Sequence, residues 1–363
     1  MLKIIFDYTA KIAGEKHLNA VLVLMADMGR EMVQSDRCAV WLIDEAKREL
    51  YTTVAHGTDE IRIPYGSGFV GGSIVSGQPV IVRDAYGDPR HNADNDRKTG
   101  YRTKSVITVP FRNNYGEIIG AYQAVNKLTA IDYFTPKDLE LLSLAASYAG
   151  KSLESVMLHQ EIIDTQREII AKMGEAGEIR SRETANHVKR VAEYSYVLAR
   201  ELGLREEEAE LLRTASPMHD IGKIAIPDDV LNKPGKLTEQ EYEMMKTHAE
   251  IGQKLLGGSR RALLRASAIV AGQHHEKWDG TGYPAGLKGE SIHIFGRITA
   301  VADVFDALST ERVYKPAWPM EKIERLFREE RGRHFDPAVV DALFATMPKL
   351  LDIRERLADE KRS

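Results

Sequence analysis

Several histidines in the C-terminal half of the sequence lie near acidic residues at spacings that suit metal binding. Glu183 and His187 are four residues apart in a helical pattern, so both side chains leave the same face of the helix one turn apart. His219 and Asp220 form an adjacent nitrogen and oxygen donor pair, and the ammonium group of Lys223 follows about one turn later. Imidazole and carboxylate groups in such pairs are common ligands of transition metals.

Further donors follow along the chain. His248 lies in the middle of a predicted helix, and the adjacent His274 and His275 end another. Asp303 lies in the apolar run 298–305, where an unpaired carboxylate would be costly. Each residue taken alone has an ordinary explanation, as a hydrogen-bonding histidine or a buried ion-pair partner. Together the donors exceed one coordination sphere, which predicts two or three metal ions bound by Glu183, His187, His219, Asp220, His248, His274, His275 and Asp303.

The donor set indicates a particular chemistry. Neighbouring metal ions stabilise the attacking and leaving oxygens of a phosphoryl displacement, and they lower the pKa of bound water to about 7. Phosphodiester hydrolysis is therefore the reaction that this sequence favours. Because all the ligands are nitrogen or oxygen, iron, manganese, zinc, nickel and cobalt remain open as the metal.

The elements that must position these donors are helices. Beyond residue 175 the pattern is helical almost throughout, and loops rich in glycine, proline and aspartate separate the helices. We predict an all-α domain over residues 176–363. Its helices are expected at 183–203, 205–219, 238–256, 260–274, 296–309, 319–330 and 337–347.

The first 150 residues have a different pattern. An amphipathic helix is predicted over 17–33, and short β-branched or aromatic runs follow it. These runs predict a five- or six-stranded antiparallel sheet covered by helices, which is an α+β sensor-like domain over residues 1–150. The strands are expected at 38–43, 50–55, 79–82, 105–111 and 117–125.

A long helix is expected to connect the two domains over residues 136–175. Thr135 is a candidate N-cap and Pro136 suits the first helical position. Apolar residues recur every seven positions, which favours a parallel homodimer through this helix. The alternative is that the same residues cover the sheet of their own chain. The repeated positions are Leu142, Ala149, Val156, Ile163 and Ile170.

Composition excludes several classes of protein. Hydrophobic residues make up 43% and charged residues 29% of the 363 residues, and the net charge is −4, which gives no basic surface for a nucleic acid. The longest uncharged run, 63–82, contains several glycines and no helical stripe, so we expect no membrane segment. Charged residues near the N-terminus argue against a signal peptide. The single cysteine, Cys38, is expected in a strand of the core, and we expect a cytoplasmic protein.

The C-terminal motifs resemble those of the HD-GYP family, the bacterial phosphodiesterases that hydrolyse cyclic di-GMP. The resemblance covers roughly residues 175–350, and the motifs occur in the family's order. They are Glu183-x3-His187-x2-Arg190, His219-Asp-Ile-Gly-Lys-Ile-Ala-Ile-Pro227, Leu231-Asn-Lys-Pro-Gly-Lys-Leu237, His248, His274-His-Glu276, Asp279-Gly-x-Gly-Tyr-Pro284, Arg297-Ile-x3-Ala-Asp303 and Phe305-Asp-Ala-Leu308.

The resemblance implies a role for each matching position. It makes the eight donors metal ligands, with Asp220 bridging metals, and Glu183 is typical of members with three metals, among which iron is favoured and manganese is an alternative. Asp220 and Lys223 become the catalytic residues, and Lys223 also contacts the scissile phosphate. The resemblance implies further substrate contacts by Gly282, Tyr283, Pro284, Asp306, Arg312 and Lys315.

The implied activity is hydrolysis of cyclic di-GMP to pGpG and, in many relatives, onward to GMP. Tyr283 is expected to stack on a guanine, although a packing role in a tight turn is the alternative. The loop Gly282-Tyr283-Pro284 also implies a GGDEF-type protein partner. Two other functions stay open at this point: a receptor that binds the dinucleotide without cleaving it, and an enzyme for another substrate such as cyclic GMP-AMP.

The N-terminal domain resembles a GAF domain. Asn126-Lys127, Phe134 and Asp138 match part of the signature of cyclic-nucleotide-binding GAF domains, but Leu139 stands where that signature has glutamate. The resemblance implies a small ligand, and purine binding is a hypothesis.

Overall fold

The computed structural model describes residues 2–15, 17–53, 60–91, 96–97, 100–181, 184–311 and 316–359. The chain divides into two compact units, Met1–Ile163 and Asp164–Ser363.

The first unit is built on a six-stranded antiparallel sheet with the strand order β3-β2-β1-β6-β5-β4. This sheet confirms the predicted α+β fold. The short strand β3 was not predicted, because only four residues carry its alternation. The strands are β1 (Ser35–Asp44), β2 (Glu49–Thr52), β3 (Ile61–Pro64), β4 (Val80–Val82), β5 (Val106–Arg112) and β6 (Ile118–Lys127).

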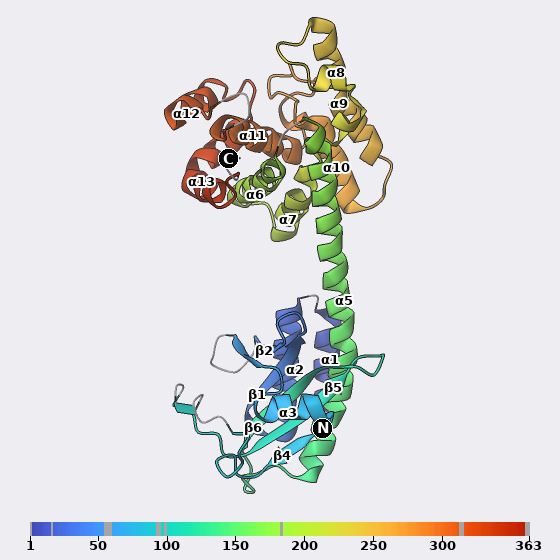
Figure 1. Ribbon diagram of the computed structural model, residues 1–363, viewed down its shortest axis with the longest axis vertical. Coiled ribbons are helices and arrows are strands. Elements are labelled where there is room, and N and C mark those ends of the chain that lie inside the picture. The colour runs from blue at the N-terminus through green and yellow to red at the C-terminus, as the bar shows by residue number, and fades with distance from the viewer. Residues whose placement is uncertain are drawn as a thin grey trace. The chain divides into compact units, whose positions relative to one another are not determined.

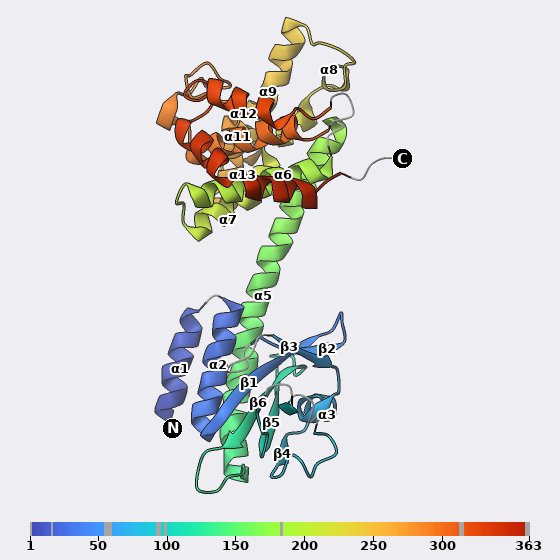
Figure 2. The same ribbon diagram turned by 90° about the vertical axis from the view of Figure 1, so that its left-hand side faces the viewer.

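Helices cover both faces of this sheet. Figure 2 shows α1 (Leu2–Gly14), α2 (Leu18–Val33) and α5 (Pro136–Ser181) on one face and α3 (Gly68–Ser76) on the other. Residues alternate along β1, so that Cys38, Val40 and Leu42 join the core under α2, whereas Trp41 joins the core under α3.

Helix α3 lies in the uncharged run in which the sequence showed no helical stripe. The helix is apolar nearly all round, so it lacks the polar face that would have revealed its period. Phe69, Val70 and Ile74 are buried on it.

Helix α5 begins as predicted, with the Asp138 carboxylate accepting a hydrogen bond from the Thr135 backbone N–H at 2.8 Å. It ends at Ser181, past the expected end at residue 175. Leu142 and Ala149 are fully buried in the core of the first unit, and Ile170 is buried in a small core of the second unit. Leu142 and Ala149 therefore cover the sheet of their own chain, as the alternative explanation had it, whereas Ile170 packs within the second unit.

Helices joined by loops form the second unit, as predicted, and an isolated bridge between Arg331 and Phe335 is the one strand-like pairing among its described residues (Figure 1). Its main apolar core is formed by α6, α7, α10, α11, α12 and α13. Among the described residues, no helix combines the length and apolar composition needed to cross a membrane. The helices are α6 (Ala185–Glu201), α7 (Glu206–Ala215), α8 (Asp228–Leu231), α9 (Glu239–Leu256), α10 (Ala262–Gln273), α11 (Ile294–Ser309), α12 (Met320–Glu329) and α13 (Pro337–Arg356), with short 3-10 turns η1 (Ser216–Met218), η2 (Ile221–Ala225) and η3 (Gly289–Ser291).

Candidate metal centre

The first side of the site is formed by α6 and α11. The Nε2 atom of His187 on α6 lies 3.6 Å from Oδ1 of Asp303 on α11. The other ring nitrogen, Nδ1, lies 2.8 Å from a carboxylate oxygen of Asp306. Arg190 holds the same carboxylate with two hydrogen bonds of 2.6 and 2.9 Å. A carboxylate behind a histidine fixes the ring and leaves the opposite nitrogen to bind a metal.

This arrangement gives Asp306 a different place from the substrate contact that we expected. Its side chain is fully buried, and Arg190 and His187 contact both of its carboxylate oxygens. Asp306 is therefore positioned to orient His187.

The centre of the site is the turn between η1 and η2, which carries His219 and Asp220. Nδ1 of His219 donates a hydrogen bond to the Ser216 carbonyl oxygen at 2.9 Å, so Nε2 is the nitrogen with a lone pair. Gly222 follows, and a Cβ there would lie 1.9 Å from the His248 carbonyl oxygen. Only glycine allows η2 to approach α9 this closely, and this approach brings Asp220 beside His248.

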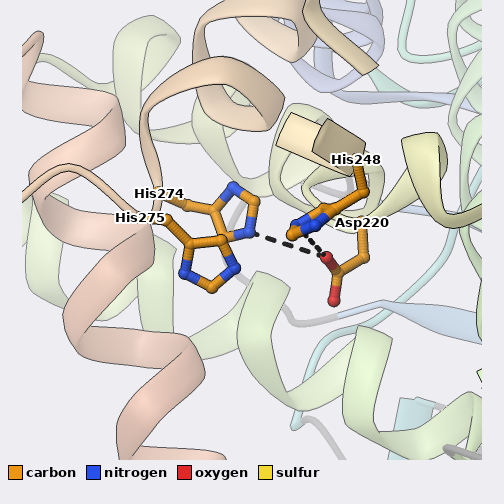
Figure 3. Close-up of side chains that lie close together, drawn as sticks. All are labelled: Asp220, His248, His274 and His275. Atoms are coloured by element: carbon orange, nitrogen blue, oxygen red, sulfur yellow. Dashed lines mark ion pairs between the residues drawn. The ribbon is translucent and has the colours of Figure 1, made fainter. Parts of the chain in front are cut away.

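The second side of the site is formed by α9 and the end of α10. Nε2 of His248 lies 3.0 Å from Oδ1 of Asp220, and Nε2 of His274 lies 3.6 Å from the same oxygen. Figure 3 shows both rings turned toward the Asp220 carboxylate, with His275 beside His274. The Nδ1 atoms of His248 and His274 face backbone carbonyl oxygens, which again leaves Nε2 as the acceptor.

The donors form two adjacent groups. In each group one ligand atom per residue lies within 4.8 Å of the others. Asp220 also lies 3.3 Å from Nε2 of His219, so its carboxylate stands between the groups. The first group is Asp220, His248, His274 and His275, and the second is Glu178, His187 and His219.

The donor atoms fit a metal ion. The Nε2 atoms of His219, His248 and His274 and Oδ1 of Asp220 are buried and make no hydrogen bond within the described part of the chain. Buried polar atoms normally have a partner, and a cation would satisfy all of these together. The structure thus brings together every predicted donor that it describes: His187, His219, Asp220, His248, His274, His275 and Asp303.

The charges of the site also favour a cation. Burial lowers the pKa of His274 and lowers that of His275 well below its usual value, so both imidazoles are neutral ligands. Burial opposes ionisation of Asp220, but Lys223 and His219 outweigh it and hold the pKa of Asp220 well below its usual range. Burial likewise opposes protonation of His219, yet nearby carboxylates, chiefly Asp220, raise its pKa to about 10, so a metal ion that binds at Nε2 would replace a proton there.

Sequence reasoning missed one donor, Glu178, near the end of α5. It is 1% exposed and lies with His187 and His219. The helical glycine Gly174 was the available signal. Glycine costs a helix about 1 kcal/mol relative to alanine, so a glycine inside a helix suggests that another segment approaches closely there. A Cβ at Gly174 would lie 2.5 Å from the Pro217 carbonyl oxygen, and Gly177 faces Ile221.

Three predicted residues lie outside the described residues: Glu183, Arg312 and Lys315.

The predicted loop Gly282-Tyr283-Pro284 lies beside the second side of the site. The Tyr283 ring is 4.8 Å from that of His275, and its backbone N–H donates to the His275 carbonyl oxygen at 3.2 Å. A Cβ at Gly282 would lie 2.3 Å from the backbone nitrogen of Lys277, so this position requires glycine.

Arg180, also at the end of α5, holds the turn that carries Lys223. Its guanidinium donates to the carbonyl oxygens of Lys223 at 3.2 Å, of Ile226 at 3.0 Å and of Ile224, and it pairs with Asp228 at 2.8 Å. Because the guanidinium is about one-third exposed, we expect the variant Arg180→Met to lose about 1–2 kcal/mol of unfolding free energy. Urea denaturation measures this loss. Lys172→Met, whose lysine is exposed on the same helix, is the control and should stay within about 0.5 kcal/mol of the wild type.

Comparison with known proteins gives the family of each unit. The GAF domain family model matches residues 17–153, and the HD domain family model matches residues 164–339. A 3'3'-cGAMP-specific phosphodiesterase 2 of Vibrio cholerae is 45% identical over 265 residues, which are 71% of this chain and 51% of that protein.

Two further relatives are similar to about half of this chain. A cyclic di-GMP phosphodiesterase response regulator of Xanthomonas campestris is 46% identical over 56% of this chain and 54% of its own length. A cyclic di-GMP phosphodiesterase of Thermotoga maritima is 41% identical over 54% of this chain and 53% of its own. The chain thus spans about half the length of these curated relatives. Along this chain a GAF domain is thus followed by an HD domain, as the two family models match in succession.

Proposed function

We propose that this chain is a cytoplasmic, metal-dependent phosphodiesterase that hydrolyses cyclic di-GMP to pGpG, with GMP as a further product, under the control of its GAF domain. One observation carries the proposal: imidazoles and carboxylates from separate helices converge on a buried centre beside a lysine. The names of the relatives support the same reaction.

The proposal includes three metal ions, with two as the alternative, and iron as the first candidate with manganese as the second. Imidazole and carboxylate donors suit both metals. The residues that would hold them are the two donor groups together with Asp303 and Glu183. When bound, such ions polarise the phosphodiester and lower the pKa of water, which makes hydrolysis feasible at neutral pH.

The protein's own residues orient the substrate and stabilise its charge. Nζ of Lys223 lies 2.6 Å from Asp220, so its ammonium is held at the centre of the site. There it would neutralise charge that develops on the phosphoryl oxygens as water attacks phosphorus and the bond to the 3'-oxygen breaks. Tyr283 lies beside His275, where its ring would stack on a guanine. Lys246 lies 5.7 Å from that ring and adds a positive charge for the second phosphate.

A second substrate is favoured by a specific observation. The relative that is 45% identical over 265 residues is named for 3'3'-cGAMP, which differs from cyclic di-GMP in one base. A third hypothesis, a receptor that binds the dinucleotide without cleaving it, uses the same residues but requires no turnover.

The proposal extends to assembly and partners. We propose a homodimer through the GAF domain and α5, a small purine as the GAF ligand, and a GGDEF-type partner at the loop Gly282-Tyr283-Pro284. Exposed apolar side chains along α5 support the dimer, which sedimentation at several protein concentrations would detect. These side chains are Leu144, Leu158, Ile162, Ile169 and Met173.

The test is a turnover assay on the full chain. Protein purified under reducing conditions is loaded with iron or manganese and incubated with cyclic di-GMP, 3'3'-cGAMP and cyclic GMP in parallel, and the products are separated by chromatography. Formation of pGpG supports the proposal. Faster turnover of 3'3'-cGAMP than of cyclic di-GMP would make 3'3'-cGAMP the substrate. If the metal-loaded protein binds cyclic di-GMP tightly and forms no product, the chain is a receptor.

A further inference from the structure

The end of α5 contributes a buried carboxylate to the donor cluster, in addition to the residues that the sequence motifs assign. Glu178 lies with His187 and His219 so that one ligand atom from each residue falls within 4.8 Å of the others. All three side chains are buried, and Glu178 is 1% exposed. We infer that Glu178 is a metal ligand of the group that contains His187 and His219, an inference that rests on the proposed function.

The local packing fixes the Glu178 carboxylate in this place. The Ser181 hydroxyl donates a hydrogen bond to Oε2 of Glu178 at 2.6 Å, and Nζ of Lys223 lies 3.5 Å from the same oxygen. Gly174 allows α5 to lie directly against the segment that carries His219, because a Cβ there would lie 2.5 Å from the Pro217 carbonyl oxygen. A carboxylate so constrained has little freedom to turn toward solvent, and a metal ligand requires such preorganisation.

Several carboxylates lie close to Lys223 and to one another at the place where Glu178 enters the site. The Lys223 ammonium is closer to Asp220, at 2.6 Å, than to Glu178, at 3.5 Å. Asp303 adds a third carboxylate, 3.6 Å from His187 and 4.0 Å from His219. Among the described residues, the carboxylates of Asp220, Glu178 and Asp303 thus gather around Lys223 and His219 in a largely buried site. Buried carboxylates are costly unless cations compensate them, so a metal ion would be stabilised at this place.

The alternative for Glu178 is a purely electrostatic role as the second counter-ion of Lys223. The two roles differ in their dependence on distance. A ligand must reach the metal, so Glu178→Asp, which keeps the charge and shortens the side chain by one methylene, should weaken binding as Glu178→Gln does. A counter-ion role should survive Glu178→Asp, and it should disappear when Lys223 is replaced.

The experiment measures binding of Mn²⁺ alone to the full chain, by titration calorimetry and by metal analysis after gel filtration. We expect Glu178→Gln and Glu178→Asp to bind about one fewer ion per chain, or to bind the weakest ion at least about tenfold less tightly. Glu175→Gln is the matched control on the same helix, because Glu175 pairs with Lys172 and Lys189 and not with the donors. Circular dichroism and thermal unfolding of the metal-free proteins show whether each variant folds.

Two outcomes overturn the inference. One is a folded Glu178→Gln variant that keeps the ion count and binds Mn²⁺ within about threefold of the wild type. The other is an effect of Glu178→Gln that vanishes in the Lys223→Met background, because this result assigns Glu178 to Lys223. Glu183→Gln is measured in parallel. Equal losses of Mn²⁺ binding in the two glutamate variants support two glutamate ligands. A loss in Glu183→Gln alone assigns the metal ligand to Glu183 and not to Glu178.

The proposed function is tested separately by hydrolysis of cyclic di-GMP by the wild type. If the wild type shows no turnover but Glu178→Gln binds one ion fewer than the wild type, the proposed function is contradicted and the ligand assignment stays intact. A wild type that is active, with unaltered Mn²⁺ binding in Glu178→Gln, contradicts the ligand assignment alone.

Discussion

Replacement of Asp220 by asparagine is expected to reduce turnover of cyclic di-GMP about 10³-fold or more. Oδ1 of Asp220 lies near Nε2 of His248 and His274, and Oδ2 lies near His219 and Lys223. Asparagine keeps the shape but removes the negative charge that both donor groups share. The loss should therefore exceed the roughly 10- to 100-fold that is typical of residues behind the ligands.

Metal content distinguishes this prediction from a general loss of folding. The Asp220→Asn variant should bind less iron or manganese per chain, and added metal should raise its melting temperature less than that of the wild type. A ligand at about 100 times its Kd stabilises a protein by about 2.7 kcal/mol, so the difference is measurable. Asp229→Asn, at an exposed position nearby, is the control. Full turnover in Asp220→Asn would remove the basis of the proposed function. His219→Ala should behave like Asp220→Asn.

The fold was predictable where the sequence carried a clear period. The strands that became β1, β5 and β6 alternate between two buried faces, and the helices of the second unit begin and end at visible loop signals. The helices and strands that the sequence did not reveal are α1, α3, α8 and β3. Helix α3 is apolar nearly all round and β3 has four residues, so neither offers enough of a pattern to measure.

Most of the site was predictable from residue types and their spacing, but the residues that enter it through packing were not. Spacing and chemistry identified the histidines and aspartates that converge. Glu178 stayed hidden because its role depends on the approach of α5 to the turn at His219, which only packing decides. Asp306 was predicted to contact the substrate because it lies in a family motif. Its hydrogen bonds to Arg190 and His187 depend on how α6 and α11 pack together, which the sequence does not show.

Lys223→Met separates substrate chemistry from metal binding. Its ammonium lies between Asp220, at 2.6 Å, and Glu178, at 3.5 Å, so it competes with a metal ion for the same carboxylates. Removing it should leave Mn²⁺ affinity unchanged or tighter. In the proposed function the same change removes the positive charge that stabilises the phosphoryl group, and loss of one such interaction lowers kcat by about 10²- to 10³-fold.

The two measurements must therefore move independently. Steady-state hydrolysis of cyclic di-GMP gives kcat, and Mn²⁺ titration gives the affinity of the same protein. Lys236→Met, at an exposed position in the loop after α8, should match the wild type in both. If Lys223→Met lost its metal together with its activity, the lysine would support the donor cluster and not the phosphate. If kcat falls while Mn²⁺ affinity is kept, the positive charge of Lys223 acts on the substrate, and the buried ion pair with Asp220 orients the ammonium group.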